Sequence, residues 1–289
     1  MSIKRSKGGL RTAVVLVATA ATLTEAAEPK RIVSLIPAVT EMIFALGEGR
    51  RLVGVSSYDR FPPEVARVPH VGGLLDPNVE TLLALKPDLV IVYNTQAELK
   101  QRLQRVGVPF YNYEHRALAD VMSTLRAVGS RIGAPTRADM LAVDMERAIA
   151  TTRASVSALP RPRTLLVFGR EPSSLRNIDA SGGHGFLHDM LEAAGSTNVF
   201  TDIKRQSVQA STEMILSARP DVIIELRYGD SVKAADLPRE LEVWNSLTSV
   251  PAVRNHRVYG LIGDEFVVPG PRVVDAVRRL ARTLHPEIQ

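Results

Sequence analysis

The chain has 289 residues, of which 45% are hydrophobic, and it contains no cysteine. That length supplies an ample apolar core for one large or two mid-sized domains, and it excludes a small fold held together by disulfides. The formal net charge is +5, but four basic residues and one acidic residue precede residue 27, which leaves +2 for the remainder. A net charge this small gives no support to nucleic-acid binding.

The first 26 residues have the three parts of a cleaved secretory signal peptide. A basic start is followed by an apolar stretch from Thr12 to Leu23 and then by small residues around Ala26. About a dozen apolar residues are too few to span a bilayer but suit a signal that is removed after export. Since no cysteine is present to carry a lipid anchor, we expect a periplasmic protein. An N-terminal membrane anchor is the alternative.

From residue 31 onward, strands are predicted to alternate with helices. Short β-branched runs predict buried strands, and amphipathic stretches that end at glycine predict helices. Such alternation favours a mainly parallel sheet with right-handed crossovers. In this half we expect strands at 31–36, 52–56, 89–93 and 109–113, and helices at 40–46, from about 79, at 96–106 and at 117–132.

One long helix is predicted in the middle of the chain. Neither Gly nor Pro interrupts residues 136–157, and apolar residues from Leu141 to Val156 follow helical spacing. Thr136 and Asp139 resemble a capping box at its start. A helix of about twenty residues spans about 30 Å, which is enough to bridge two lobes. An ordinary surface helix of one lobe is the alternative.

The second half repeats the α/β pattern. Strands are expected at 164–168, 222–226 and 258–262, and helices at 186–194, at 212–218 and from about 272. The chain is therefore divided into a signal peptide (1–26), an N-terminal α/β lobe (27–135), a linking helix (136–159) and a C-terminal α/β lobe (160–289).

The two halves share one motif. Residues 78–91 reappear in outline as residues 211–224: a polar helix start, one glutamate, two apolar turns, a basic residue, Pro-Asp and a β-branched run. Proline ends each helix, and the residue before it is expected to be extended. The repeat predicts two lobes of one design with a cleft between them. The matched acids, Glu80 and Glu213, suggest a partner that engages both lobes.

Three motifs carry a resemblance to a known family. Residues 31–41, residues 53–58 with the prolines at 62 and 63, and residues 85–91 together resemble the Fe/B12 family of periplasmic substrate-binding proteins. The resemblance runs from about residue 30 to the C-terminus. It implies two Rossmann-like lobes joined by one long helix, and delivery of vitamin B12, a ferric siderophore or haem to an ABC importer.

The resemblance also implies a role for the paired glutamates. In the family, acids that match Glu80 and Glu213 lie on the outer surfaces of the lobes and meet arginines of the transporter. Two distant ion pairs fix a docking axis, although each exposed pair is weak. The alternative is a helix-dipole role, since each acid lies in a first helical turn. The expected partner is an inner-membrane ABC permease, and the protein is expected to be a monomer.

The ligand is expected where ligands of open α/β sheets bind, outside the carboxyl ends of the strands. Aromatic side chains there would stack on a planar ligand, and arginines would pair with carboxylate or phosphate. Packing or loop roles are the alternative for each residue. The predicted ligand contacts are Tyr58, Tyr93, Asn94, Arg170, Ser207, Arg227, Asp264 and Phe266.

The match to the family's cobalamin receptor is partial. Tyr58, Tyr93 and Asp264 agree with its pocket, whereas Leu74 and Ser207 replace tryptophans. The lost stacking surface leaves the ligand open between a corrinoid, a ferric siderophore and haem.

Metal and enzyme sites find less support. His184 and His188 are four residues apart, a ligand pair if the segment is helical, but no third ligand is evident. We find no nucleophile elbow, no phosphate-binding loop, no His-Glu-x-x-His and no cysteine nucleophile. We therefore expect a binding protein without a resident cofactor or metal and not an enzyme. A haem or metal-ion binding protein and an exported α/β hydrolase are the alternatives.

Overall fold

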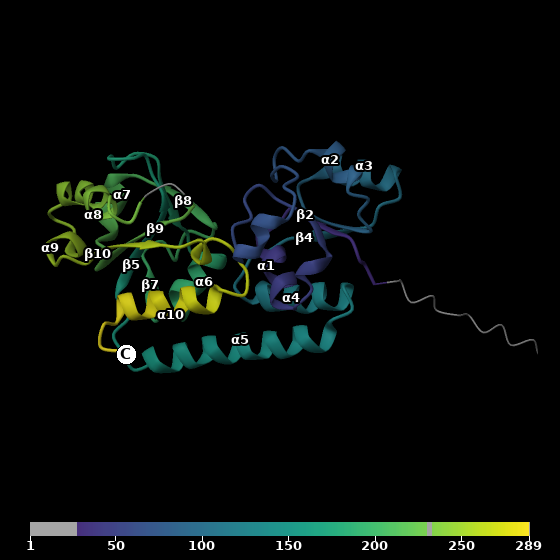
Figure 1. Cartoon of the computed structure of the whole chain (residues 1–289). Coiled ribbons are helices and arrows are strands. Elements are labelled where there is room, and N and C mark those ends of the chain that lie inside the picture. The colour runs from purple at the N-terminus through teal and green to yellow at the C-terminus, as the bar shows by residue number, and fades with distance from the viewer. Residues whose placement is uncertain (1–27, 230–232, 289) are drawn as a thin grey trace, which may run out of the picture.

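The structure, a computed structural model, describes residues 28–229 and 233–288. Two α/β lobes lie side by side, and one long helix runs beneath both of them (Figure 1). The predicted signal peptide lies outside the described residues. Within the described ranges, no helix is both long and apolar enough to cross a membrane.

The N-terminal lobe is built on a four-stranded sheet with the order β2-β1-β3-β4, and every neighbouring pair is parallel. The inner strands β1 and β3 are buried on both faces, as their unbroken apolar runs predicted. The strands are β1 (Ile32–Ser34), β2 (Leu52–Val55), β3 (Leu89–Tyr93) and β4 (Phe110–Tyr113). The helices are α1 (Pro37–Ala45), α2 (Val79–Ala84), α3 (Ala97–Arg105) and α4 (Ala119–Arg131).

The C-terminal lobe has a mixed sheet in the order β10-β9-β5-β6-β8, with β7 beside β5. β10, β9, β5 and β7 are parallel, whereas β6 is antiparallel to both of its neighbours. The strands are β5 (Arg163–Gly169), β6 (Ile178–Ser181), β7 (Thr197–Asn198), β8 (Ser207–Ala210), β9 (Val222–Arg227) and β10 (Val258–Ile262). The helices are α6 (Phe186–Ala193), α7 (Thr212–Ala218), α8 (Leu237–Leu241), α9 (Pro251–Arg254) and α10 (Val273–Leu284).

The long helix α5 (Pro135–Val156) has 22 residues and packs on α4 of one lobe and on α6 and α10 of the other. The bridging helix of the sequence analysis is therefore confirmed. The predicted capping box is wrong, because Pro135 already occupies the first turn and no side chain caps the helix start. Asp139 instead binds Arg126 of α4 at 2.9 Å.

The duplicated motif folds in the same way in both lobes. Asn78 caps α2 by accepting the N–H of Thr81 at 3.0 Å, and Ser211 caps α7 by accepting the N–H of Met214 at 3.3 Å. Both helices run into a central strand, β3 or β9. The two lobes thus share one local design.

The Pro-Asp step of each motif ties the helix to the first strand of its own lobe. The Asp88 carboxylate accepts the N–H of Arg31 at 2.8 Å, and that of Asp221 accepts the N–H of Arg163 at 3.0 Å. The residue before each proline was expected to be extended, but it is left-handed: φ is 47° at Lys86 and 48° at Arg219, which follows α7. A left-handed residue ends a helix sharply and still allows Pro-Asp to turn into the strand.

The crossing of α4 and α5 depends on one glycine. A Cβ on Gly129 would lie 2.2 Å from the Cβ of Ala138. We expect Gly129→Ala to lower the free energy of unfolding by about 1–3 kcal/mol, because the helices must move apart and this outweighs the better helix propensity of alanine. Urea denaturation measures the change. Ser130→Ala, an exposed substitution in the same turn, is the control and should not destabilise; equal effects of the two would contradict this packing.

Candidate functional site

A cleft lies at the carboxyl ends of the strands, between the lobes. One cavity of about 410 Å³ opens at the ends of the N-terminal strands, and a second of about 470 Å³ lies on the side of the C-terminal lobe. His115 and Val267 line both cavities, so the two cavities adjoin each other. The first is lined by Leu35, Ile36, Pro37, Ala38, Ser56, Tyr58, Leu74, Leu75, Tyr93, Tyr113, His115, Val267, Val268 and Pro269, and the second by His115, Phe168, Phe186, Leu187, Gln206, Ser207, Tyr228 and Val267.

A row of four rings crosses this cleft from one lobe to the other. The ring centroids of Tyr93 and Tyr113 are 5.9 Å apart, those of Tyr113 and His115 are 5.6 Å apart, and those of His115 and Phe186 are 6.2 Å apart. These are ordinary distances for favourable ring pairs. Tyr93 and Tyr113 end β3 and β4 and His115 follows β4, whereas Phe186 begins α6. We call these four residues the aromatic row.

Three of the eight predicted ligand contacts line the cleft. Tyr58 and Tyr93 lie in the first cavity and Ser207 in the second. Tyr58 is 64% exposed, so its ring has a free face for stacking. A role of these residues in ligand binding stays a prediction.

The two predicted arginines lie behind the cleft wall, where carboxylates balance their charge. The guanidinium of Arg170 is fully buried, donates to Glu225 at 3.0 Å, and donates to the main-chain carbonyl of Glu240 at 2.6 Å. Arg227 forms an ion pair with the same Glu225, which also accepts the indole N–H of Trp244 at 2.8 Å. Neither arginine lines a cavity, so in this structure they pair with the protein and not with an anion in the cleft.

The other three predicted contacts also have partners outside the cleft. Asn94 lies in an exposed polar network, where its side chain accepts from Asn112 at 3.1 Å. Asp264 accepts the N–H of Gly229 at 2.8 Å. Phe266 is fully buried in the core.

The sequence analysis missed three members of the aromatic row: Tyr113, His115 and Phe186. A signal existed for the first, because Tyr113 ends a predicted strand and the carboxyl-end rule selects that position. His115 and Phe186 carry no local signal, since their neighbours in the row come from another part of the chain.

The histidine pair is not a helical pair. α6 begins at Phe186, so His184 precedes the helix and does not share a helical face with His188. In the part of the chain that the structure describes, no group of three or more His, Asp or Glu side chains is arranged to hold a metal ion.

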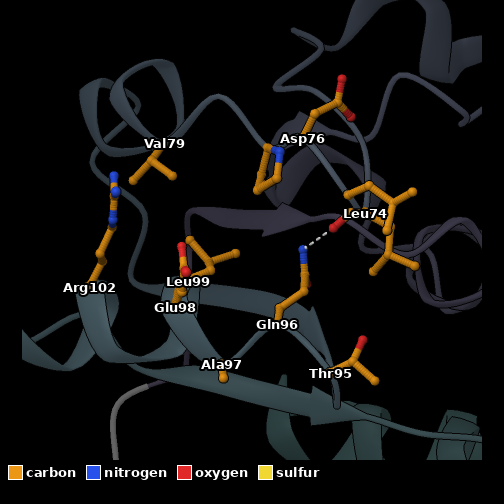
Figure 2. Close-up of a pocket in the computed structure, with 11 residues that line it drawn as sticks. Leu74, Asp76, Val79, Thr95, Gln96, Ala97, Glu98, Leu99 and Arg102 are labelled. Carbon is orange, nitrogen blue, oxygen red and sulfur yellow. Dashed lines mark hydrogen bonds between the residues drawn. The ribbon is translucent and has the colours of Figure 1, made fainter.

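A further hollow of about 570 Å³ lies on the N-terminal lobe alone, between the loop that precedes α2 and helix α3. Figure 2 shows Gln96 reaching the carbonyl of Leu74, at 2.8 Å, whereas Arg102 lies at the left of the view, below Val79. Leu74 and Leu75 line both this hollow and the cleft, so their loop separates the two. No residue of the other lobe contributes to it.

One ion pair connects the lobes beside the cleft. Glu41 of α1 is buried and accepts two hydrogen bonds from Arg272, which precedes α10: Nε to Oε2 at 2.9 Å and Nη2 to Oε1 at 2.5 Å. The guanidinium also lies 4.2 Å from the ring centroid of Phe61 and 3.5 Å from Glu265. Burial raises the pKa of Glu41, and the hydrogen bonds and charge of Arg272 oppose that rise.

Removing the charge of Glu41 should destabilise the protein. Glu41→Gln leaves a largely buried guanidinium without its main counter-ion, and we expect the free energy of unfolding to fall by about 3 kcal/mol. Arg278→Gln is the matched control, because its pair with Asp275 is exposed and contributes less than about 1 kcal/mol. Urea denaturation of both variants compares the two pairs; losses of equal size would mean that the interlobe pair is no stronger than a surface pair.

Asp59 is a buried acid in the loop that carries Tyr58. It is 5% exposed, and its Oδ2 accepts the N–H of Ser56 at 2.8 Å. Burial raises its pKa from 3.8 to about 7, and the negative charge of Glu41 adds to the rise. The hydroxyl of Thr40 and the N–H of Ser56 act in the opposite direction.

The raised pKa makes stability depend on pH in a defined direction. Between pH 4 and 7 the folded protein holds the Asp59 proton more tightly than the unfolded chain does, so the free energy of unfolding falls as the pH rises. About three pKa units correspond to roughly 4 kcal/mol. Asp59→Asn should therefore gain stability relative to the parent protein as the pH rises from 4 to 8. If urea denaturation gave the same pH dependence of stability for Asp59→Asn and for the parent protein, the raised pKa of Asp59 would be contradicted.

Comparisons with known proteins agree with this architecture. A family profile described as "Periplasmic binding protein" matches residues 32–264. The chain is 31% identical over 265 residues to an uncharacterised ABC transporter substrate-binding lipoprotein of Bacillus subtilis, covering 90% of this chain and 81% of the relative. It is 32% identical over 281 residues to a vitamin B12-binding protein of Yersinia pseudotuberculosis, covering 95% and 92%.

Solved structures of similar fold have different named ligands. A periplasmic heme-binding protein of Roseiflexus superposes with a TM-score of 0.74 at 28% identity, covering 90% of this chain and 99% of the other. A periplasmic vitamin B12-binding protein of Vibrio cholerae superposes with a TM-score of 0.76 over the same shares. At 24% identity, the second similarity concerns the fold alone.

Proposed function

Because this chain belongs to the periplasmic binding protein family and is a substrate-binding protein of the ABC-transporter type, we propose that it binds a corrinoid or a ferric chelate between its lobes and presents it to an ABC permease. One observation carries the proposal: residues of both lobes line two adjoining cavities at the carboxyl ends of the two sheets. That is the position at which open α/β sheets bind ligands.

The chemistry of the cleft supports a large, flat ligand. Its walls are mainly apolar and aromatic, and all four rings of the aromatic row line it. Tyr58 and Tyr228, at 64% and 41% exposed, offer rings from opposite lobes. The similarities to B12-binding and heme-binding proteins favour this class of ligand over the substrate of a hydrolase. The protein would carry its ligand without chemistry on it.

The matched glutamates support docking at two points. Glu80 and Glu213 are exposed in the first turns of α2 and α7, which lie at the top of the two lobes in Figure 1, on the side opposite α5. The hydroxyl of Ser211 lowers the pKa of Glu213, which keeps that side chain anionic. Exposed ion pairs contribute only ~0.2–1 kcal/mol each, so two of them would set register more than affinity.

The setting of the protein is part of the same proposal. Residues 1–26 would direct export and be cleaved, and the lobes 27–135 and 160–289, joined by 136–159, would act as a monomer in the periplasm. The B. subtilis relative is named a lipoprotein, whereas this chain has no cysteine for a lipid anchor.

Charge reversal tests the docking surface. We expect Glu80→Arg combined with Glu213→Arg to abolish ligand uptake by cells that contain the permease, because both ion pairs become repulsive, while the purified variant still binds ligand. Asp144→Arg is the matched control: it reverses an exposed acid on α5, on the opposite side of the molecule, and should leave uptake unchanged. Loss of ligand binding in the double variant would place the two acids at the ligand site instead.

A further inference from the structure

Among the described residues, the walls of the cleft carry no formal charge. Across residues 28–229 and 233–288, no Lys, Arg, Asp or Glu side chain lines either interlobe cavity. The titratable groups that do line them are four tyrosines and His115. A ligand in this space therefore meets aromatic faces, aliphatic groups and a few neutral polar groups.

Four arginines of the segments around the cleft are engaged with other parts of the protein. Arg170 and Arg227 share the buried carboxylate of Glu225, with side chains 0% and 10% exposed. Arg272 is held by Glu41. Arg60 lies beside Gly229 and has interactions of its own. The cleft thus has arginines around it but does not present their charge.

Two members of the aromatic row supply neutral polar groups instead. The hydroxyl of Tyr113 and Nδ1 of His115 are buried, and neither has a hydrogen-bond partner among the described residues. Burial raises the pKa of Tyr113 and lowers that of His115, so both side chains are uncharged near neutral pH. A neutral imidazole has one donor and one acceptor nitrogen, and the phenol can both donate and accept.

This combination discriminates between ligands by charge. A carboxylate that entered the cleft would lose its water without gaining a counter-ion, which is unfavourable. A carboxamide or hydroxamate carbonyl would lose less on desolvation and would find neutral donors. Unpartnered buried groups also favour a ligand that satisfies them.

We propose that the cleft selects a ligand without net charge, and that Tyr113 and His115 are specificity-determining residues that bind its amide-type groups. The inference rests on the proposed function and narrows its ligand. Two sources share this chemistry: a corrinoid, whose rim carries carboxamides, and an uncharged ferric trihydroxamate. Haem, with two propionates, and ferric triscatecholates, which are anionic, fall outside it.

Titration of the purified protein with four coloured ligands tests the proposal. The ligands are cyanocobalamin, an uncharged ferric trihydroxamate, haem and a ferric triscatecholate, each followed by absorbance. We expect one uncharged ligand to bind at least about tenfold more tightly than both anionic ones, and the first two arms identify which source it is. Tighter or equal binding of haem or the triscatecholate overturns the charge selection but leaves the proposed function standing. Absence of binding for all four overturns the proposed function itself.

Variants locate the selection in the aromatic row. Tyr113→Phe should weaken binding of the preferred ligand about tenfold, the effect of one lost hydrogen bond, whereas Tyr111→Phe removes a hydroxyl from the same strand outside the cavities and should have no effect. His115→Lys should shift the preference towards haem, and His115→Gln, which stays neutral, should keep it. If His115→Lys does not fold, the two tyrosine variants and His115→Gln still test the proposal. Unchanged binding in Tyr113→Phe contradicts it, and so does loss of the preference for the uncharged ligand in His115→Gln.

Discussion

The bidentate pair between Glu41 and Arg272 is a directional contact between the lobes on which the geometry of the cleft depends. Helix α5 runs beneath both lobes and buries apolar surface against each, but apolar contacts are not directional and tolerate small rotations. Two charge-assisted hydrogen bonds between a planar carboxylate and a planar guanidinium fix both distance and orientation. The ring of Phe61 covers the guanidinium and keeps the pair partly dry, which strengthens it. The helix holds the lobes together, and the ion pair restrains how they face each other.

The duplicated motif explains why a site forms between the lobes. In each lobe a capped helix, a left-handed basic residue and an aspartate bound to the first strand produce the same turn into a central strand. The matched acids therefore start equivalent helices, and equivalent strand ends border the cleft. The lobes differ in how their strands pair. The first sheet is wholly parallel, whereas the antiparallel strand β6 makes the second sheet mixed. The cleft is consequently two-sided without being symmetric.

Features set by interactions between neighbours in the sequence could be predicted, whereas features set by contacts between distant residues could not. β3, α7 and β10 have the predicted bounds, because apolar runs and proline or glycine stops are local signals. β6 and β8 were missed, since their polar positions become strand only through antiparallel pairing with each other. The site was harder still: Arg170 meets Glu225 55 positions away, and Glu41 meets Arg272 231 positions away. An arginine at a strand end looks the same in sequence whether it faces a ligand or a buried carboxylate.

Because the arginines face buried carboxylates, they affect the chemistry of the cleft only indirectly. Arg170, Arg227 and Glu225 are buried behind the wall, with the partly exposed Glu240 beside them. Burying such a cluster is costly in desolvation, and apolar residues of equal volume would often be at least as stable. The geometry of the cluster is nevertheless specific. The indole of Trp244 donates to the carboxylate of Glu225, and the guanidinium of Arg170 donates to a main-chain carbonyl. The cluster holds β9 and the segment after β5 in place at the edge of the cleft while its charges cancel inside the lobe. Ionic groups therefore help to shape the cleft, although only neutral groups of the described residues line it. The polarity that a ligand meets depends on ion pairs that the ligand itself does not contact.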